Sequence, residues 1–153
     1  MQKEYRKGVG LMIMNKDRKV FVAKRLDTFS DAWQMPQGGI DENEDPKDAA
    51  LREMLEEIGT NNATIIASSK KWYSYDFPAE YTNKLFAGKY QGQSQLWFLM
   101  QYNGTDADIN LTAHTPEFSD WQWIDMKELP QLIVPFKRKL YLDVIDEFEP
   151  LIL

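Results

Sequence analysis

A helix with clear start and stop signals at residues 46–58 constrains the fold of this chain more than any other segment. Asp45 suits the N-cap, Pro46 the first helical position and Gly59 the position just after the last turn. At about 100° per residue, four apolar residues share one face of this helix: Leu51, Met54, Leu55 and Ile58.

The opposite face of the predicted helix carries three carboxylates, Glu53, Glu56 and Glu57. Negative charges at i, i+3 and i+4 repel one another, and the helix dipole disfavours them near the C-terminus. A hard divalent cation would make the cluster favourable, because carboxylate oxygens are the ligands that Mg²⁺ prefers. A solvated acidic surface is the alternative interpretation, and the helix alone does not decide between the two.

The spacing of residues around this helix matches a known motif. Gly38 is followed by a fixed series of positions: Glu44, Arg52, Glu53, Glu56, Glu57 and Gly59. This is the Nudix box, Gly-x5-Glu-x7-Arg-Glu-U-x-Glu-Glu-x-Gly-U with U apolar, and the chain resembles the Nudix hydrolases. Thr60 stands where the family prefers an apolar residue. Because Thr60 follows the helix, we expect only a small effect on packing.

The resemblance implies an α/β (α+β) fold, an α/β/α sandwich with a mixed central sheet. It also implies hydrolysis of a nucleoside diphosphate linked to another group, with bound divalent ions activating the water. Glu53, Glu56 and Glu57 would be metal ligands, and one of them could be the general base. Arg52 and Glu44 would form an ion pair that orients these carboxylates.

The paired glycines Gly38 and Gly39 are expected to let the backbone turn tightly and approach a ligand closely. The resemblance implies that a backbone carbonyl here, of Gln37 or Gly38, also binds metal. Mg²⁺ is the expected ion, with Mn²⁺ and Zn²⁺ as alternatives.

Composition limits the classes of function that remain. With 153 residues, the chain is expected to form a single domain, residues 1–153. The absence of cysteine excludes disulfides, thiolate metal sites and a cysteine nucleophile, and fits the cytoplasm. One histidine, His114, leaves little room for a zinc centre or a Ser-His-Asp triad. The net charge of −6 argues against non-specific nucleic-acid binding, so DNA is not an expected partner. The sequence contains no apolar run of about 18 residues and no charged segment followed by an apolar one, so neither a membrane span nor a secretory signal is expected.

Apolar and β-branched runs predict strands at 9–14, 20–25, 63–68, 71–75, 94–102 and 121–124. The first two, around the polar residues 15–17, predict a hairpin. Loops are expected at 26–32, 77–93 and 103–116, with a short extended segment at 33–37. A short helix is predicted from Asp125 to Leu132, and a final helix from Pro135.

Several side chains outside the box have two interpretations. Arg6 and Arg25 would be ordinary surface charges or phosphate contacts. Tyr73 and Tyr75 share one strand face, which suits core packing or a stacking platform for a base. The first turn of the final helix is basic at residues 137–139, against its dipole, and that arrangement is favourable if it faces an anion.

Short stretches along the whole chain are similar to the bacterial RNA pyrophosphohydrolases, also described as dinucleoside polyphosphate hydrolases. These stretches are YRKGVG (5–10), WQMPQGGI (33–40), WYSYD (72–76), GQSQLWF (92–98), PEF (116–118) and FKRKLY (136–141). The similarity implies a further carboxylate metal ligand at Glu117, which alone would be read as a surface charge. It also implies substrate contacts at Gly38 and at six further residues: Arg6, Arg25, Gly39, Tyr75, Phe136 and Lys137.

The expected substrate is therefore 5′-triphosphorylated RNA, from which pyrophosphate is removed to leave a 5′-monophosphate that favours RNA decay. Dinucleoside polyphosphates such as diadenosine tetra- or pentaphosphate are the alternative substrate. A non-catalytic nucleotide-binding regulator is a third possibility, and the intact set of acids argues against it. The oligomeric state stays open.

Overall fold

The computed structural model describes residues 4–26, 31–81 and 85–152. Its strands are β1 Glu4–Met14, β2 Val20–Arg25, β3 Gln37–Gly39, β4 Ala63–Ser68, β5 Tyr73–Asp76, β6 Tyr90–Tyr102 and β7 Phe118–Ile124. Its helices are α1 Pro46–Ile58, α2 Leu129–Leu132 and α3 Arg138–Phe148, with a short 3₁₀ turn at Pro135–Lys137 before α3.

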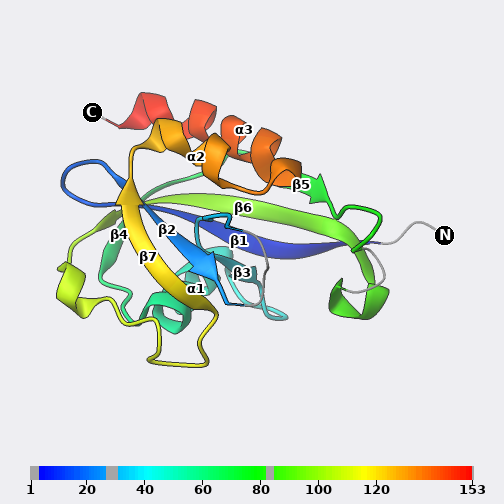
Figure 1. The fold of residues 1–153 in the computed structure, drawn as a ribbon, viewed down its shortest axis with the longest axis horizontal. Coiled ribbons are helices and arrows are strands. Elements are labelled where there is room, and N and C mark those ends of the chain that lie inside the picture. The colour runs from blue at the N-terminus through cyan, green and yellow to red at the C-terminus, as the bar shows by residue number, and fades with distance from the viewer. Residues whose placement is uncertain (1–3, 27–30, 82–84, 153) are drawn as a thin grey trace.

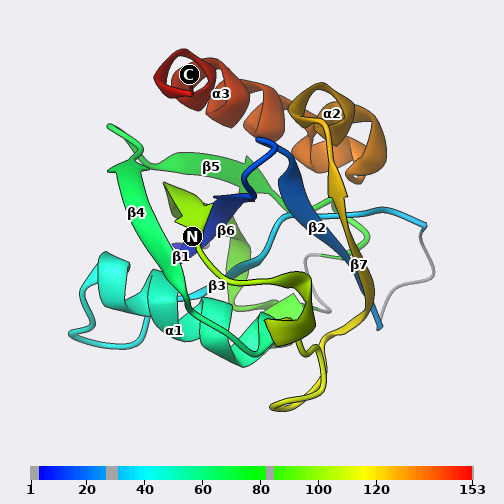
Figure 2. The same ribbon diagram turned by 90° about the vertical axis from the view of Figure 1, so that its left-hand side faces the viewer.

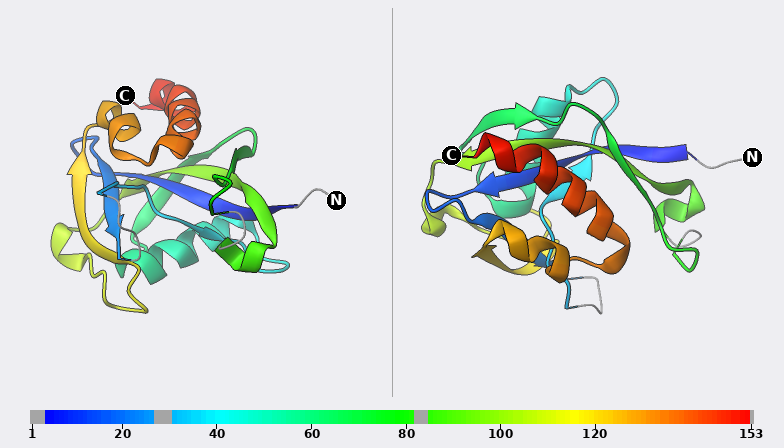
Figure 3. Two further views of the ribbon diagram at one scale, coloured as in Figure 1. Left: turned by 45° about the vertical axis from the view of Figure 1, so that its right-hand side comes forward. Right: turned by 90° about the horizontal axis from the view of Figure 1, so that it is seen from above.

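The strands form one mixed sheet between two layers of helix, which confirms the predicted α/β/α arrangement. The sheet order is β4-β6-β1-β2-β7, with β3 added to β1 and β5 added to β6. Helix α1 covers one face, and α2 and α3 cover the other (Figures 1 and 2). Seen from above, α3 crosses the strands (Figure 3).

The central strand β1 is apolar on both faces because helices cover both sides of the sheet. Val9, Leu11 and Ile13 face the core under α1. Met12 and Met14 face the core under α3. β1 runs parallel to β6, and this long pairing fixes the middle of the sheet.

Helix α1 has the predicted bounds and the predicted caps. The Asp45 side chain accepts a hydrogen bond from the Lys47 amide, and Gly59 ends the helix in the left-handed conformation with φ of 81°. One part of the face assignment is wrong: Leu55 is exposed, whereas Glu57 is buried. The interpretation of the acidic face as fully solvated therefore fails at Glu57.

Several strand boundaries differ from the predictions because pairing across the sheet extends elements past their apolar runs. β1 begins at Glu4, so Arg6 lies within the strand. β6 begins at Tyr90, inside the predicted loop, and β7 begins at Phe118. The predicted strand 71–75 is β5 at Tyr73–Asp76. Part of each of two predicted loops, residues 27–30 and 82–84, lies outside the described residues.

The predicted hairpin of β1 and β2 is present, and its antiparallel pairing is short. β1 and β2 pair only at Met14 and Val20 and then diverge. Beyond that point, Gly8 and Gly10 of β1 pair with Gly39 and Gln37 of β3. The divergence places the Gln37–Gly39 segment beside β1, where the candidate site lies.

The segment leading into β3 is anchored by a buried tyrosine from α3. The Tyr141 hydroxyl accepts a hydrogen bond from the Met35 amide at 2.8 Å, and neither residue is exposed to solvent. Trp97 packs edge-on against the Tyr141 ring, with 5.8 Å between ring centroids. This contact fixes the approach of the chain to Gln37 and Gly38.

Replacing Tyr141 with phenylalanine is expected to lower the free energy of unfolding by about 1–3 kcal/mol, because the buried Met35 N–H loses its acceptor. The measurement is urea denaturation of both proteins. Tyr81→Phe, at an exposed tyrosine, is the matched control and should change stability by less than about 0.5 kcal/mol. Equal stability of Tyr141→Phe and the wild type would contradict the anchoring role.

None of the helices in the described ranges is both long and apolar enough to span a membrane.

Candidate active site

The C-terminal end of α1 carries a buried carboxylate, Glu57. Glu57 is only 4% exposed. Its Oε2 atom is buried and has no hydrogen-bond partner among the described residues. Burial raises the pKa of Glu57 well above its ordinary value, and the nearby negative charges of Glu53 and Glu117 raise it further. Burying an ionised carboxylate costs free energy of folding unless a cation pairs with it or a proton neutralises it.

Glu53 and Glu117 complete an acidic cluster around Glu57. Glu53 lies directly over Gly38, since a Cβ at that glycine would overlap the Glu53 carboxyl group. Burial raises the pKa of Glu53 to about 7, although Arg52 opposes this effect. Glu117 precedes β7 and is held there by its carbonyl, which accepts a hydrogen bond from the Leu26 amide at 2.9 Å. Glu117 acts on the pKa values of both Glu53 and Glu57, so the fold brings it together with the acids of α1, and its role as a metal ligand stays a prediction.

Arg52 ties the acidic cluster to the loop before α1. Its Nε and Nη2 atoms donate to the two Glu44 carboxylate oxygens at 2.8 and 2.9 Å. Nη2 also donates to the Gly39 carbonyl at 2.9 Å. Nη1 donates to Glu53 at 2.9 Å and to Glu56 at 3.3 Å. The guanidinium lowers the pKa of Glu44 to about 2, so this pair stays ionised at neutral pH. The geometry matches the predicted orienting ion pair.

The donor set fits a divalent cation, with one rearrangement. Within the described ranges, no three His, Asp or Glu side chains already form a ready-made ligand group. Arg52 Nη1 holds one oxygen of Glu53 and one of Glu56, and these contacts would rearrange when a cation binds. A cation would give Glu57 Oε2 the partner that it lacks among the described residues, and it would offset the negative charges of Glu53 and Glu117 nearby.

The two glycines of β3 lie between the acidic cluster and a cationic cluster, which consists of Arg6, Arg25 and Lys137. The prediction of a tight turn here is wrong, because Gly38 and Gly39 lie in an extended strand paired with Val9 and Gly8. The expected close approach does occur: a Cβ at Gly39 would overlap the Arg6 guanidinium. Acidic groups therefore contact one glycine and a basic group contacts the next.

Lys137 is buried in the cationic cluster. The residue is 7% exposed, and its Nζ donates to Gln37 Oε1 at 3.3 Å. Burial, together with the nearby positive charge of Arg25, lowers the pKa of Lys137 to about 7. The positive charge of Arg25 also lowers the pKa of Glu57 and that of Tyr75, so Arg25 lies near both the acidic cluster and Lys137. Two cations at such close range favour the binding of an anion between them.

Aromatic residues border the cationic cluster. The Lys137 ammonium lies 5.1 Å from the centre of the Tyr75 ring. The Phe136 ring also packs against Tyr75, tilted and with 5.9 Å between ring centroids, and Phe136 is 36% exposed. Burial raises the pKa of the Tyr75 hydroxyl to about 12, against the opposing effects of Gln37, Arg25 and Arg6. The predicted substrate contacts outside the glycines are thus brought together.

Two polar residues of this region were not singled out from the sequence. The Gln95 amide donates to Gln37 Oε1 at 3.1 Å from a fully buried position in β6. Gln93 lies between Arg6 and Tyr75 in the strand register, and its Oε1 is buried without a partner among the described residues. The sequence signal was weak, because β6 also carries the polar residues Gln91, Ser94 and Gln101; only the two-residue spacing of Gln93 and Gln95 places them on one strand face.

A model of the NUDIX domain family matches residues 4–144, which include the whole acidic cluster. The chain belongs to the Nudix family. This assignment confirms the resemblance drawn from the spacing of Gly38, Glu44, Arg52 and the glutamates.

Curated relatives of this Nudix protein are similar over almost its full length. A Rickettsia bellii protein named RNA pyrophosphohydrolase is 56% identical over 148 residues, covering 97% of this chain and 92% of the relative. A Rickettsia prowazekii protein of the same name is 55% identical with the same coverage.

Solved structures show the same fold at low sequence identity. An Escherichia coli dihydroneopterin triphosphate pyrophosphohydrolase has a TM-score of 0.72 at 19% identity, covering 93% of this Nudix chain and 97% of its own. A Caenorhabditis elegans Ap4A hydrolase complex has a TM-score of 0.62 at 21% identity, covering 90% and 94%. These matches support the Nudix fold of the chain.

Proposed function

We propose that this Nudix protein removes pyrophosphate from the 5′-triphosphate end of RNA, leaving a 5′-monophosphate that favours RNA decay. The observation that carries the proposal is the placement of an acidic and a cationic cluster on neighbouring glycines of one strand. A polyphosphate laid across Gly38 and Gly39 would have carboxylates on one side and Arg6 and Lys137 on the other. The RNA is favoured because relatives named RNA pyrophosphohydrolase are 55–56% identical over 97% of the chain.

In this proposal, Glu53, Glu56, Glu57 and Glu117 hold divalent metal, with Mg²⁺ preferred over Mn²⁺ or Zn²⁺ because all four offer oxygen donors. The backbone carbonyl of Gln37 or Gly38 is a further candidate ligand. When bound, the metal supplies charge neutralisation and an activated water.

The other residues of the site bind and orient the substrate. Arg52 holds Glu53 and Glu56 in place through its bond to Glu44. Arg6, Arg25 and Lys137 compensate the charge of the polyphosphate, which is otherwise repelled by the net charge of −6. Tyr75 and Phe136 provide aromatic surface for a base beside the phosphates. We further propose that residues 1–153 form one Nudix domain that acts in the cytoplasm.

The proposal is tested by comparing two substrates. Purified protein with Mg²⁺ is given a 5′-triphosphorylated RNA or diadenosine tetraphosphate, and kcat/KM is measured for each. We expect the RNA to have the higher value and to yield pyrophosphate and 5′-monophosphorylated RNA, with no turnover in excess chelator. Faster cleavage of diadenosine tetraphosphate would assign the dinucleotide as the main substrate. No turnover of either would indicate a binding protein.

Replacing Lys137 with methionine is expected to raise the free energy of unfolding by about 1–2 kcal/mol while lowering kcat/KM. The stability gain follows because methionine fills a similar volume without burying a charge. Gln37 Oε1 keeps its bond from Gln95. The activity loss, about 10-fold or more, follows from the missing phosphate contact.

Denaturation and kinetics on the same preparation test this pair of changes. Lys127→Met, at an exposed lysine, is the control and should leave both quantities unchanged. A variant that loses stability and activity together would show that Lys137 has a structural role instead.

A further inference from the structure

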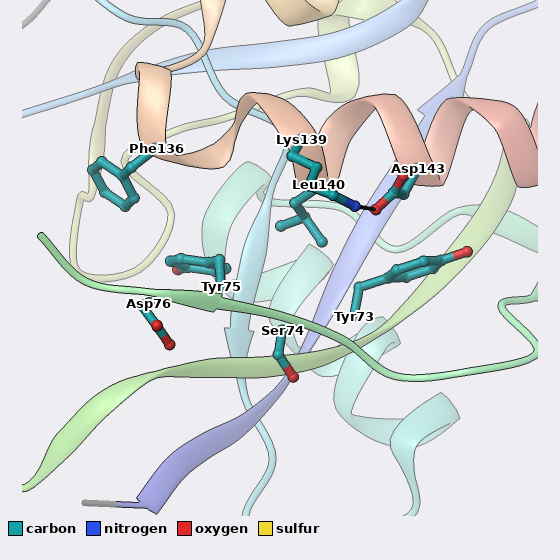
Figure 4. Close-up of a pocket in the computed structure, with 8 residues that line it drawn as sticks. All are labelled: Tyr73, Ser74, Tyr75, Asp76, Phe136, Lys139, Leu140 and Asp143. Atoms are coloured by element: carbon teal, nitrogen blue, oxygen red, sulfur yellow. Dashed lines mark hydrogen bonds and ion pairs between the residues drawn. The ribbon is translucent and has the colours of Figure 1, made fainter.

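A groove lies at the opposite end of β1 from the proposed substrate site. Figure 4 shows the cleft at the start of α3, which is lined by Tyr75 and Phe136 among others and belongs to the substrate site. Arg6 and Met14 are eight positions apart in β1, which is about 25 Å of extended chain. The second groove, here called the C-terminal groove, has a volume of about 460 Å³. Its walls include Met14, Lys16, Arg18, Ile66, Gln101 and Leu151.

The end of α3 forms one side of the C-terminal groove. A 3₁₀ turn, Glu149–Leu151, follows α3 directly. Seen from above, the end of α3 lies beside the loop between β1 and β2 (Figure 3). Leu151 and Lys16 accordingly line the same groove, although they are far apart in the sequence.

The C-terminal groove has an apolar lining that is partly open to solvent. Ile66 of β4 is 46% exposed, and Leu151 is 50% exposed. Met14 lies between them as a buried residue. Large apolar side chains that gather at one hollow with a polar rim are typical of a surface that packs against another protein. The groove is therefore a candidate contact surface.

The loop between β1 and β2 gives the groove a positive rim. Lys16 and Arg18 line the groove, Lys19 follows them, and all three are exposed. The ion pairs among the described residues involve none of the three. A partner with exposed carboxylates would compensate these charges.

The conformation of this loop fixes the position of Arg18. Asn15 Oδ1 accepts hydrogen bonds from the Asp17 and Lys19 amides at 2.9 and 3.0 Å. Arg18 lies between them in the left-handed region, with φ of 63°. Glycine or asparagine is favoured there, because a β-carbon crowds the backbone. An arginine held in a disfavoured conformation suggests a use for its charge.

The end of α3 carries the complementary charges. Asp146 and Glu149 are exposed, and they lead directly into Leu151. Neither acid belongs to an ion pair among the described residues. The helix dipole disfavours them at this end of α3. One surface region thus combines unpaired cations, unpaired acids, a hollow and an exposed leucine.

We propose that two copies of the chain form a two-fold dimer through the C-terminal groove. Leu151 of each copy lies in the groove of the other, and Arg18 of each copy pairs with Asp146 of the other. A two-fold interface needs a patch that complements a rotated copy of itself, and this region supplies both members of each contact. The net charge of −6 makes the chain itself an acidic partner. The inference goes beyond the proposed function and does not depend on it.

Charge reversal tests the dimer, with the dissociation constant measured by sedimentation equilibrium. We expect a value of about 10–100 µM for the wild type at about 50 mM NaCl, and weaker association at about 500 mM. Arg18→Glu and Asp146→Lys should each raise the dissociation constant at least about 10-fold. The reason is that a two-fold dimer contains each substitution twice and so turns two attractive pairs into repulsive ones.

Mixing the two variants is the decisive arm of the experiment. In a heterodimer of Arg18→Glu with Asp146→Lys, one contact pairs the new glutamate with the new lysine, and the other keeps Arg18 with Asp146. Association should therefore recover to near the wild-type value in the mixture. A symmetric pairing of these two residues predicts this recovery, whereas a general effect of net charge on association does not.

Two further variants separate loss of the interface from loss of the fold. Arg18→Asn removes the charge and suits the left-handed conformation, so it should weaken the dimer while remaining at least as stable as the wild type in urea. Lys47→Glu, at an exposed lysine of α1, is the control and should leave the dissociation constant unchanged. A wild type that stays monomeric at about 200 µM would overturn the proposal, and so would a mixture that shows no recovery. Because the groove contains none of the proposed substrate contacts, either result leaves the proposed function untouched.

Discussion

Replacing Glu57 with glutamine is expected to lower kcat/KM for a 5′-triphosphorylated RNA by at least about 100-fold in the presence of Mg²⁺. Glutamine keeps the shape of the side chain and removes its charge from the centre of the acidic cluster. A 100-fold loss corresponds to about 2.7 kcal/mol of transition-state stabilisation. Glu53→Gln should have an effect of the same order, because Glu53 belongs to the same acidic cluster.

A stability measurement separates loss of metal binding from loss of fold. Without metal, Glu57→Gln should be at least as stable as the wild type, because the buried Oε2 atom has no hydrogen bond to lose within the described part of the chain. Mg²⁺ should raise the melting temperature of the wild type and not of the variant. Glu42→Gln, an exposed acid in the loop before α1, is the control. Near-normal turnover by both Glu57→Gln and Glu53→Gln would refute the assignment of the site.

The second large effect is expected for Arg52→Lys, a change that keeps the charge. Lysine cannot reproduce the two-pronged contact with Glu44 while also reaching the Gly39 carbonyl and Glu53. We expect kcat/KM to fall about 10- to 100-fold at low Mg²⁺, because the carboxylates are misplaced but still present.

The dependence on Mg²⁺ concentration identifies this indirect role. High Mg²⁺ should recover part of the Arg52→Lys activity, whereas Glu57→Gln should recover little. Arg18→Lys, at an exposed arginine, controls for the exchange of side chains. If Mg²⁺ gave no recovery in Arg52→Lys, Arg52 would have to act on the substrate itself.

The parts of the fold that follow from local rules were predictable. Asp45, Pro46 and Gly59 determine the ends of α1 through neighbouring backbone groups, so its bounds agree with the sequence prediction. The shared face of Tyr73 and Tyr75 follows from the two-residue period of a strand, and both are buried. The close approach of Glu53 to Gly38 and of Arg6 to Gly39 was predictable because glycine has no side chain to prevent it.

The remaining features depend on partners far away in the chain. Helical spacing places Leu55 with the apolar residues, but the position of the sheet decides that it is exposed and that Glu57 is buried. β1 diverges from β2 because β3 and β6 occupy its edges. The acceptor for the Met35 amide lies in α3 and has no local signal. Family resemblance, and not spacing, indicated that Glu117 and Lys137 belong with the box.

The pairing of β1 with β6 has a consequence for biosynthesis. Leu11 of β1 lies opposite Phe98 of β6 in parallel register. During synthesis, β1 leaves the ribosome first and cannot complete this pairing until β6 has been synthesised. Until then the run VGLMIM at 9–14, which is buried in the finished protein, has an open edge. Such long-range parallel pairing is slow, and an unpaired apolar edge promotes aggregation. We therefore expect truncated chains that end before β6 to be insoluble, and the full chain to benefit from chaperones that hold nascent chains.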